Sequence, residues 1–257
     1  MKARWITRSL LALALVVLAA CSPEFGVKEG AVNWLDLTSP TGEVYTHVSD
    51  ATTATISAAP TATEGNVREV FWRTTTPWSH DQQVCTTWDD VTDASTVDKL
   101  HALTLDDVSQ PGLALRIAKT TDGGAYRAIT ITQNIWAGGL WLFWVDTWDT
   151  TPNADPNHEA FTGVAMFDLS SSVGSLTANS TTMAPPPWHI CARLTGSQLS
   201  FMVWAGANPQ PSWDDPVLVH TAQLPEGWDY WGYAGGYAGH VHAGKSLTLS
   251  GMTVAAL

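Results

Sequence analysis

The chain of 257 residues carries 24 acidic and 12 basic residues, a formal net charge of −12, and charged residues make up only 14% of it. So few Lys and Arg residues cannot easily form the basic stripe that nucleic acids require, and 14 Trp residues argue against a disordered chain. The composition is that of a compact, acidic, Trp-rich protein, whose length suits one large β domain or two small ones.

The first segment has the features of an export signal. Residues 1–8 include Lys2, Arg4 and Arg8, and residues 9–20 form an apolar run too short to span a bilayer comfortably. The run ends in Leu-Ala-Ala-Cys, which resembles the lipobox of bacterial lipoproteins and implies cleavage before Cys21 and lipidation of its thiol. An ordinary signal peptide and an uncleaved anchor are the alternatives.

This interpretation divides the chain into three parts: a signal peptide (1–20), a tether from the lipidated cysteine (21–43) and a single β-sandwich domain (44–257). The protein would then be exported and anchored to the outer face of the bacterial cytoplasmic membrane or to the cell envelope. Because the mature domain is strongly acidic, we expect it to meet the membrane through the lipid alone. We expect a monomer with no nucleic-acid partner.

Two cysteines remain beyond the lipidation site, Cys85 and Cys191. An exported chain resides where disulfides form, so these two are expected to pair; two buried free thiols are the alternative. Closing a loop of about a hundred residues would stabilise the fold by roughly 4–5 kcal/mol in the chain-entropy model.

Short alternating or apolar segments, separated by turn residues, predict β-strands almost throughout. Along residues 113–119 the side chains alternate clearly between two faces of a strand. Residues 139–146 instead form a continuous apolar run, typical of a strand buried on both faces. Residues 96–105 have room for one or two helical turns. The expected strands are 67–73, 84–88, 112–119, 126–132, 139–146, 160–169, 188–194, 198–205, 217–221, 230–234 and 246–254.

Many short strands without crossover helices predict an all-β, antiparallel two-sheet sandwich with few or no helices. Two segments then carry a resemblance to a family. Val-Asp-Thr-Trp at 145–148, followed by Ala-Asp-Pro-Asn-His at 154–158, is similar to the metal loop of legume-type lectins. Leu-Pro-Glu-Gly-Trp at 224–228, running into 232–236, is similar to a segment near the end of those lectins. The resemblance implies a jelly roll of the concanavalin A-like type, a fold that also carries glucanases, lyases and adhesion modules.

An acidic segment follows the apolar run at 139–146 and is the first candidate site. Calcium prefers six to eight oxygen ligands, which clustered carboxylates and carbonyls on a loop supply; a solvated acidic turn is the alternative. The candidate calcium ligands are Asp146, Asp149, Asp155, Asn157 and Glu159. Trp144 stands where lectins of this type usually have an acidic residue, which argues against a second, transition-metal site.

Aromatic residues near loops and strand ends form the second candidate site. The flat C–H faces of sugar rings stack on indole, and a few placed polar groups then bind the hydroxyls. Trp72, Trp141, Trp144 and Trp204 lie inside strand patterns and are expected in the core. The candidate ligand-binding residues are Trp136, Trp148, Trp213, Trp228, Trp231, Tyr233 and Tyr237.

Catalytic patterns are weak. A glycosidase needs two carboxyl groups across the sugar, and a glucanase of this fold would show Glu-x-Asp-x-x-Glu on one strand, which the sequence lacks. Ser79-His80-Asp81 contains the residue types of a catalytic triad, but adjacent residues cannot easily form the relay, so a turn is expected. His240 and His242 have metal-binding spacing without an evident third ligand.

The sequence therefore predicts a lipid-anchored, non-catalytic module that binds a glycan, with calcium as an expected cofactor and no catalytic residues. A glycoside hydrolase or polysaccharide lyase on the same fold is the first alternative. A structural envelope lipoprotein without a small ligand is the second.

Overall fold

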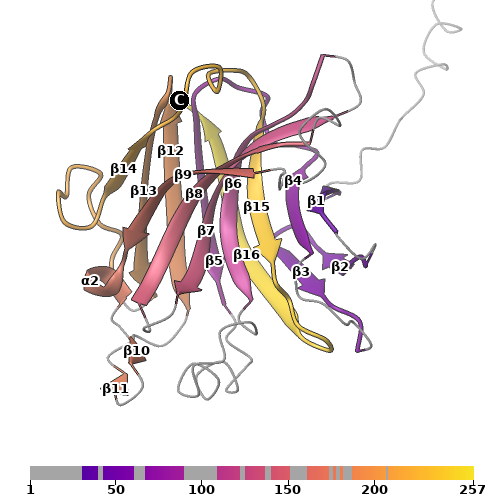
Figure 1. The fold of residues 1–257 in the computed structure, drawn as a ribbon, viewed down its shortest axis with the longest axis horizontal. Helices are drawn as coiled ribbons and strands as arrows, with labels where there is room; N and C mark the ends of the chain where they lie inside the picture. The colour runs from indigo at the N-terminus through magenta and orange to yellow at the C-terminus, as the bar shows by residue number, and fades with distance from the viewer. Residues whose placement is uncertain are drawn as a thin grey trace, which may run out of the picture.

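The computed structural model describes residues 31–39, 43–60, 67–89, 109–121, 125–136, 140–150, 161–173, 176–177, 180–181, 187–206 and 208–257. Two layers of antiparallel strands lie face to face (Figure 1). The only helix among these residues is the single turn α2 (Ser170–Val173). In the described part of the chain, no helix is long and apolar enough to cross a membrane.

The first layer, here called sheet I, contains seven strands. In spatial order these are β1 (Val32–Thr38), β4 (Arg68–Arg73), β15 (Tyr233–Gly239), β6 (Gln110–Lys119), β7 (Tyr126–Trp136), β8 (Leu140–Asp149) and β9 (Phe161–Asp168). The late strand β15 is inserted between the early strands β4 and β6, so segments far apart in the sequence are neighbours in this sheet.

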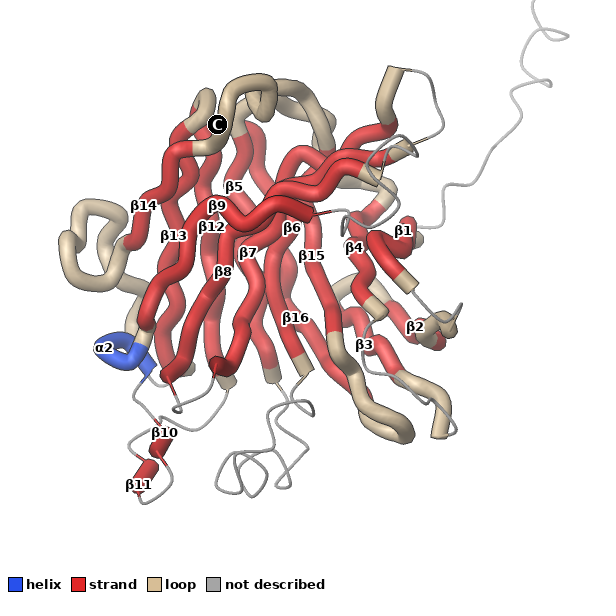
Figure 2. The backbone as a smooth tube through the Cα atoms, viewed as in Figure 1, coloured by secondary structure: helices blue, strands red, loops and turns tan. Residues whose placement is uncertain are grey.

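The second layer, sheet II, also has seven strands. Their order is β14 (His220–Gln223), β13 (Gln198–Ala205), β12 (Trp188–Thr195), β5 (Gln82–Trp88), β16 (Ser246–Ala256), β3 (Thr53–Ser57) and β2 (Thr46–Ser49). A separate pair, β10 (Leu176–Thr177) and β11 (Ser180–Thr181), lies at one end of the sandwich (Figure 2). These two sheets confirm the predicted antiparallel jelly-roll sandwich.

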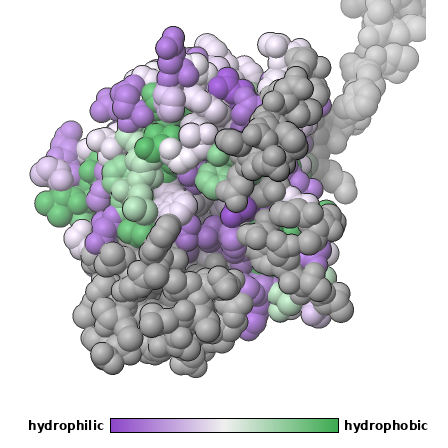
Figure 3. Space-filling model, viewed as in Figure 1, coloured by the Kyte–Doolittle hydropathy of each residue, from purple (hydrophilic) through white to green (hydrophobic). Residues whose placement is uncertain are grey.

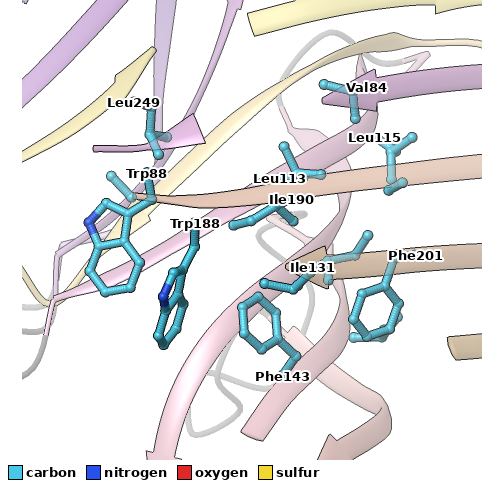
Figure 4. Close-up of a cluster of buried hydrophobic side chains, with 14 of the residues drawn as sticks. Val84, Trp88, Leu113, Leu115, Ile131, Phe143, Trp188, Ile190, Phe201 and Leu249 are labelled. Atoms are coloured by element: carbon cyan, nitrogen blue, oxygen red, sulfur yellow. The ribbon is translucent and has the colours of Figure 1, made fainter. Parts of the chain in front are cut away.

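The main core lies between the inner faces of the two sheets. Figure 4 shows Val84, Leu113, Ile190 and Phe201 converging there, with the Trp88 and Trp188 rings edge to face at 5.4 Å. Each fully buried side chain of this kind contributes about 1.5–3 kcal/mol, so the core supplies the main stabilising free energy. β5 alternates between buried and half-buried residues along its length, as expected for a strand whose second face meets solvent.

A second apolar cluster covers the outer face of sheet I. It consists of Leu37, Val70, Ala114, Ile117, Ala128, Trp148 and Tyr237. β6 is consequently buried on both faces from Pro111 to Ala118, which corrects the expectation that residues 113–119 expose every second side chain. A register shift in its pairing with β7 between Leu115 and Ala118 interrupts the alternation there.

The expected tether contains a strand of the domain. β1 lies within residues 21–43 and pairs along its whole length with β4, and Trp34 packs on the main core and stacks on His47 at 3.9 Å. The boundary predicted at residue 44 is therefore wrong, and the folded domain includes β1. Cys21 and the expected signal peptide lie outside the described residues, as does the helical turn expected at 96–105.

The predicted disulfide between Cys85 and Cys191 is confirmed. The two residues lie directly opposite each other on the neighbouring strands β5 and β12, on the outer face of sheet II. The bond joins positions 106 residues apart in the sequence.

Candidate functional site

A short backbone ladder at one end of the sandwich positions several aromatic residues. Ser79 and Gly232 form an isolated antiparallel bridge in which each N–H donates to the other carbonyl at 3.1 Å. Side chains alternate across such a ladder, so those of residues 78, 80, 231 and 233 lie on one side while Ser79 is buried on the other. This end is the upper one in Figure 1, beside the C-terminus, whose Leu257 N–H donates to the Asp81 carbonyl.

The ring contacts agree with this placement. Tyr233 stacks on Trp72 with the centroids 5.6 Å apart and meets Trp78 edge to face at 4.8 Å, and His80 lies 6.1 Å from Trp231. We call Trp72, Trp78, His80, Trp231 and Tyr233 the aromatic platform. Trp78 and Trp231 are 47% and 55% exposed, which is high for indoles and leaves both rings available to a ligand.

A buried arginine holds the platform from below. Arg116 is fully buried at the irregular point of β6 with a positive φ of 49°. Its guanidinium donates to the carbonyls of His80 at 3.2 Å, Trp228 at 2.6 Å and Gly196 at 2.6 Å. Three loops distant in sequence are thereby joined at one charged group.

Gln82 completes this support. Its side-chain nitrogen donates to the carbonyls of Ser79 and Gly232, the two residues of the bridge, while its oxygen accepts from the Arg116 N–H at 3.0 Å. Gly232 is required here because a Cβ would lie 2.5 Å from the Arg116 backbone. Because Gln82 binds both carbonyls of the bridge and the Arg116 N–H, the platform is held in place before any ligand binds.

Two carboxylates form a polar rim around His80. Its Nδ1 lies 2.7 Å from Asp81 and its Nε2 lies 2.7 Å from Asp229, whose carboxylate also pairs with Arg116 at 3.0 Å. The hydrogen bond that the Gly196 N–H donates to Asp81 is the main reason why the pKa of this carboxyl lies below its usual range. The neighbouring His80 and Arg116 lower this pKa further. The rim thus offers carboxylate oxygens as hydrogen-bond acceptors next to the exposed indoles.

The structure separates the predicted ligand-binding residues. Trp231 and Tyr233 belong to the platform. Trp228 is half-buried against the main core with the Arg127 guanidinium 4.1 Å from its ring, and Trp213 lies on the outer side of sheet II under Arg193. Trp136 ends β7, but its side chain lies outside the described residues.

Two of those predictions are wrong. Trp148 and Tyr237 are only 2% and 1% exposed and belong to the apolar cluster on the outer face of sheet I. The Trp148 indole N–H donates to Thr130 at 2.8 Å, so its polar atom is also satisfied. Neither ring is accessible to a surface ligand, because this face of the sheet is covered rather than open to solvent.

The expected calcium ligands are not brought together in the described residues. Asp146 lies on the outer face of β8, where burial raises its pKa to about 7 and no hydrogen bond reaches its Oδ1 from the described residues. Asp149 lies three positions on, so its side chain leaves the other face of the strand, and it pairs with Arg127 at 3.4 Å. Asp155, Asn157 and Glu159 lie outside the described part of the chain.

A single desolvated carboxylate does not make a calcium site, which needs several oxygen ligands. Across the described ranges, no group of three His, Cys, Asp or Glu residues is placed to hold a metal ion. Because Asp155, Asn157 and Glu159 lie outside the described residues, calcium binding stays a prediction, on which the platform itself does not depend.

Sequence reasoning missed three contributors to the site. The sequence marks no role for Trp78, Ser79-His80-Asp81 predicts only a turn, and Trp72, which its strand pattern predicts in the core, is half-buried under Tyr233. The available signal was Pro77-Trp78, an aromatic residue in a polar turn. Its partner Tyr233 is far away in sequence, which is why the local pattern gave no hint of a shared surface.

No protein-family model and no curated protein matches the chain. Among solved structures, it is similar to the exoplasmic/lumenal domain of VIP36 in its Ca²⁺-bound form, with 9% identity and a TM-score of 0.47 over 88% of this chain and 83% of that one. A Saccharomyces cerevisiae protein of unknown function shows 13% identity and a TM-score of 0.44 over 90% and 98%. A Bacillus subtilis protein of unknown function with a galectin-like fold shows 11% identity and 0.44 over 88% and 96%. Similarities this distant carry no functional argument, so the assignment rests on the site itself.

Proposed function

We propose that this protein is a non-catalytic carbohydrate-binding module whose aromatic platform holds a neutral glycan. The observation that carries the proposal is the pair of exposed indoles, Trp78 and Trp231, on the same side of a ladder fixed from below by Arg116. Indole faces stack on the C–H faces of a sugar, and the carboxylates of Asp81 and Asp229 accept hydrogen bonds from its hydroxyls.

The dimensions of the platform favour a chain of sugars over a single ring. Trp78 lies opposite Tyr233 and His80 lies opposite Trp231, in two rows about 7 Å apart along the ladder. A ligand that covers both rows must extend beyond one pyranose ring. Affinity is therefore expected to rise from the monosaccharide to the trisaccharide and then to level off.

The charges around the platform favour a neutral glycan. Asp81 and Asp229 form the rim and the exposed Glu226 lies three positions before Asp229 in the chain, whereas Arg116 is buried and already bonded to protein carbonyls. A uronic-acid polymer would bring like charge to this carboxylate rim.

A binding role fits the chemistry of the site better than catalysis. Both ring nitrogens of His80 are engaged by carboxylates, so His80 is not poised to take a proton from a substrate. Asp146 and Asp149, two acids of the expected calcium loop, leave opposite faces of β8 and cannot act as a carboxyl pair across one sugar. A hydrolase or lyase remains the alternative, and it would release sugar products where a binding module releases none.

We also propose that the domain works outside the cytoplasmic membrane, tethered through lipidated Cys21. The support is the sequence of residues 1–21, together with the Cys85–Cys191 disulfide, which belongs to an oxidising compartment. Radiolabelled palmitate should enter the wild-type protein expressed in bacteria but not a Cys21→Ser variant. Equal labelling of both would contradict lipidation at this residue.

The test of the platform is binding to a panel of neutral glycans (cellulose, xylan, mannan, starch and chitin fragments) measured by calorimetry. Trp78→Ala and Trp231→Ala should each weaken binding about tenfold, the order expected for losing one ring contact of about 1.4 kcal/mol. Met166→Ala, which removes another exposed apolar side chain at the far edge of sheet I, is the control and should leave affinity unchanged.

The same samples distinguish the alternatives. Reducing sugar accumulating with wild-type protein would replace the binding proposal with an enzymatic one. Absence of binding to every glycan in the panel, or full affinity in both Trp variants, would refute the platform as a carbohydrate site.

A further inference from the structure

The outer face of sheet II carries a cavity that the platform does not use. It has a volume of about 260 Å³ and lies over β5, β12, β13 and β16, with one wall supplied by the loop after β13. We call it the disulfide groove, because Cys85 and Cys191 form part of its lining. Its full lining consists of Gln83, Cys85, Thr86, Thr87, His189, Cys191, Trp204, Gln210, Gly251 and Thr253.

The groove is lined by hydrogen-bonding groups of low charge. Two amides, three threonines and one imidazole surround an apolar part made by the disulfide and Trp204. No Asp, Glu, Lys or Arg is found among these lining residues, although the chain has 24 acidic residues. Such a surface matches a neutral ligand with several hydroxyls and one apolar face.

A disulfide and side-chain hydrogen bonds fix the positions of the lining residues before any ligand binds. The disulfide joins β5 and β12 beneath the groove, and the Thr87 hydroxyl lies 2.8 Å from Nδ1 of His189. The Arg193 Nε donates to the Gln83 side-chain oxygen at 2.6 Å, which leaves the Gln83 NH₂ group as the end that can donate to a ligand.

The loop that supplies Gln210 is also fixed. The Arg193 guanidinium lies 4.1 Å from the ring of Trp213 in this loop, and Trp213 packs against the apolar cluster of Cys191, Met202 and Trp204. The Asp215 carboxylate accepts from the N–H groups of Val217 and Leu218 and closes a turn within the loop. A ligand would therefore meet a preformed wall and would not have to order it.

We propose that the disulfide groove is a second binding site, which takes a single neutral sugar ring independently of the platform. The volume is below the range of about 300–1,000 Å³ typical of sites for drug-sized ligands, so one ring is the expected occupant. Cys85 and Thr87 lie five and seven residues along the chain from His80, or roughly 17–23 Å in extended backbone. One sugar ring cannot bridge that distance, whereas a polymer can engage both sites and gain avidity.

The test follows backbone amide signals of the full mature chain by NMR during titration with methyl glycosides of glucose, galactose, mannose and N-acetylglucosamine. At least one of these four probes should shift the amides of Gln83, Thr87, Gln210 and Gly251. The shifts should persist in the Trp78→Ala/Trp231→Ala double variant, which lacks the platform indoles. Polysaccharide affinity of the same variant reports separately on the platform.

Two variants address the groove itself. Thr253→Trp places a large side chain at an exposed lining position and should abolish the groove shifts, and Gln210→Ala should weaken the site severalfold. The matched control is Thr221→Trp, at an exposed threonine of the same sheet on β14, outside the lining, and it should bind as wild type. Dispersed spectra of each variant establish that it is folded.

Groove shifts that are lost in Thr253→Trp and kept in the platform variant would support the second site. Absence of groove shifts with all four glycosides, or undiminished shifts in Thr253→Trp, would overturn it. If the amide signals of platform residues alone shift, the second site is refuted while the proposed function stands. If polysaccharide binding is absent and the groove shifts remain, the proposed function is refuted while the second site stands.

Discussion

Asp146→Asn provides the sharpest test of how the outer face of sheet I is built. The carboxyl of Asp146 is buried beside Gly163 of β9, with its Oδ1 3.8 Å from the position of a Cβ there. Burial raises its pKa from 3.8 to about 7, although the positive charge of Arg68 acts in the opposite direction. The folded protein therefore holds a proton that the unfolded chain releases at a lower pH.

The two pKa values of Asp146 determine how the stability of the fold changes with pH. Because the folded pKa is the higher one, the stabilising proton is fully present below about pH 4, and its contribution is lost as pH rises through about 7. A shift of about three pH units corresponds to roughly 4 kcal/mol in the free energy of unfolding. Asn carries no charge at any of these pH values, so the variant should not lose this free energy.

The assay is urea unfolding of wild type and Asp146→Asn at pH 4 and pH 8. The free energy of unfolding of the variant, relative to that of wild type, should be higher at pH 8 than at pH 4 by up to about 4 kcal/mol. This magnitude follows from the difference between the folded and unfolded pKa values of Asp146. The cost of burying the amide is the same at both pH values and cancels in this comparison. Asp214→Asn, at an exposed loop position, is the control and should show little relative change.

A relative gain below about 1 kcal/mol would refute the view that Asp146 is a desolvated, protonated carboxyl. Calcium offers a second, independent outcome. If calcium at pH 8 stabilises wild type and not Asp146→Asn, the carboxylate is a metal ligand and the expectation from the sequence is restored.

Three further predictions concern stability. Reduction of Cys85–Cys191, which closes a separation of 106 residues, should lower the free energy of unfolding by roughly 4–5 kcal/mol in urea titrations, and a loss below about 1 kcal/mol would show that the reduced chain keeps the constraint. Gly235→Ala should destabilise by about 2 kcal/mol or more, because its Cβ would lie 1.8 Å from the Phe71 carbonyl oxygen; Gly163→Ala, whose nearest atom is 3.8 Å away, is the matched control in the same assay. Arg116→Met should cost about 3–5 kcal/mol in thermal or urea unfolding, since it leaves three carbonyls and a carboxylate without their cation, and near-native stability would contradict its role as a support.

Much of the fold was predictable because strand formation leaves a local record. Alternation, apolar runs and turn residues predicted the strands at 188–194 and 198–205, and the structure has β12 and β13 at nearly the same positions. β1 was missed, since its segment VNWLDLT is short and follows a stretch that resembles a tether. Its place in sheet I depends on pairing with β4, a partner about 35 residues away.

The candidate site was only half predictable. Loop-side position was a sound guide for Trp231 and Tyr233, but the same criterion failed for Trp148 and Tyr237, which point into a second apolar cluster. Sequence position says where a side chain leaves the backbone. It does not say whether the face that it leaves from is covered by other parts of the chain.

By itself, the sequence determined an acidic, Trp-rich, all-β chain with one expected disulfide. Composition, the alternation of apolar and polar residues and the number of cysteines are local or additive properties, so they can be determined without the fold. The surface that Trp78 shares with Tyr233, the opposite directions of Asp146 and Asp149, and the groove over the disulfide were decided by tertiary structure. Each of these depends on which strands become neighbours and which faces they bury. That outcome depends on contacts between segments far apart in the chain, such as the hydrogen bond from Gln82 to Gly232, which are 150 residues apart.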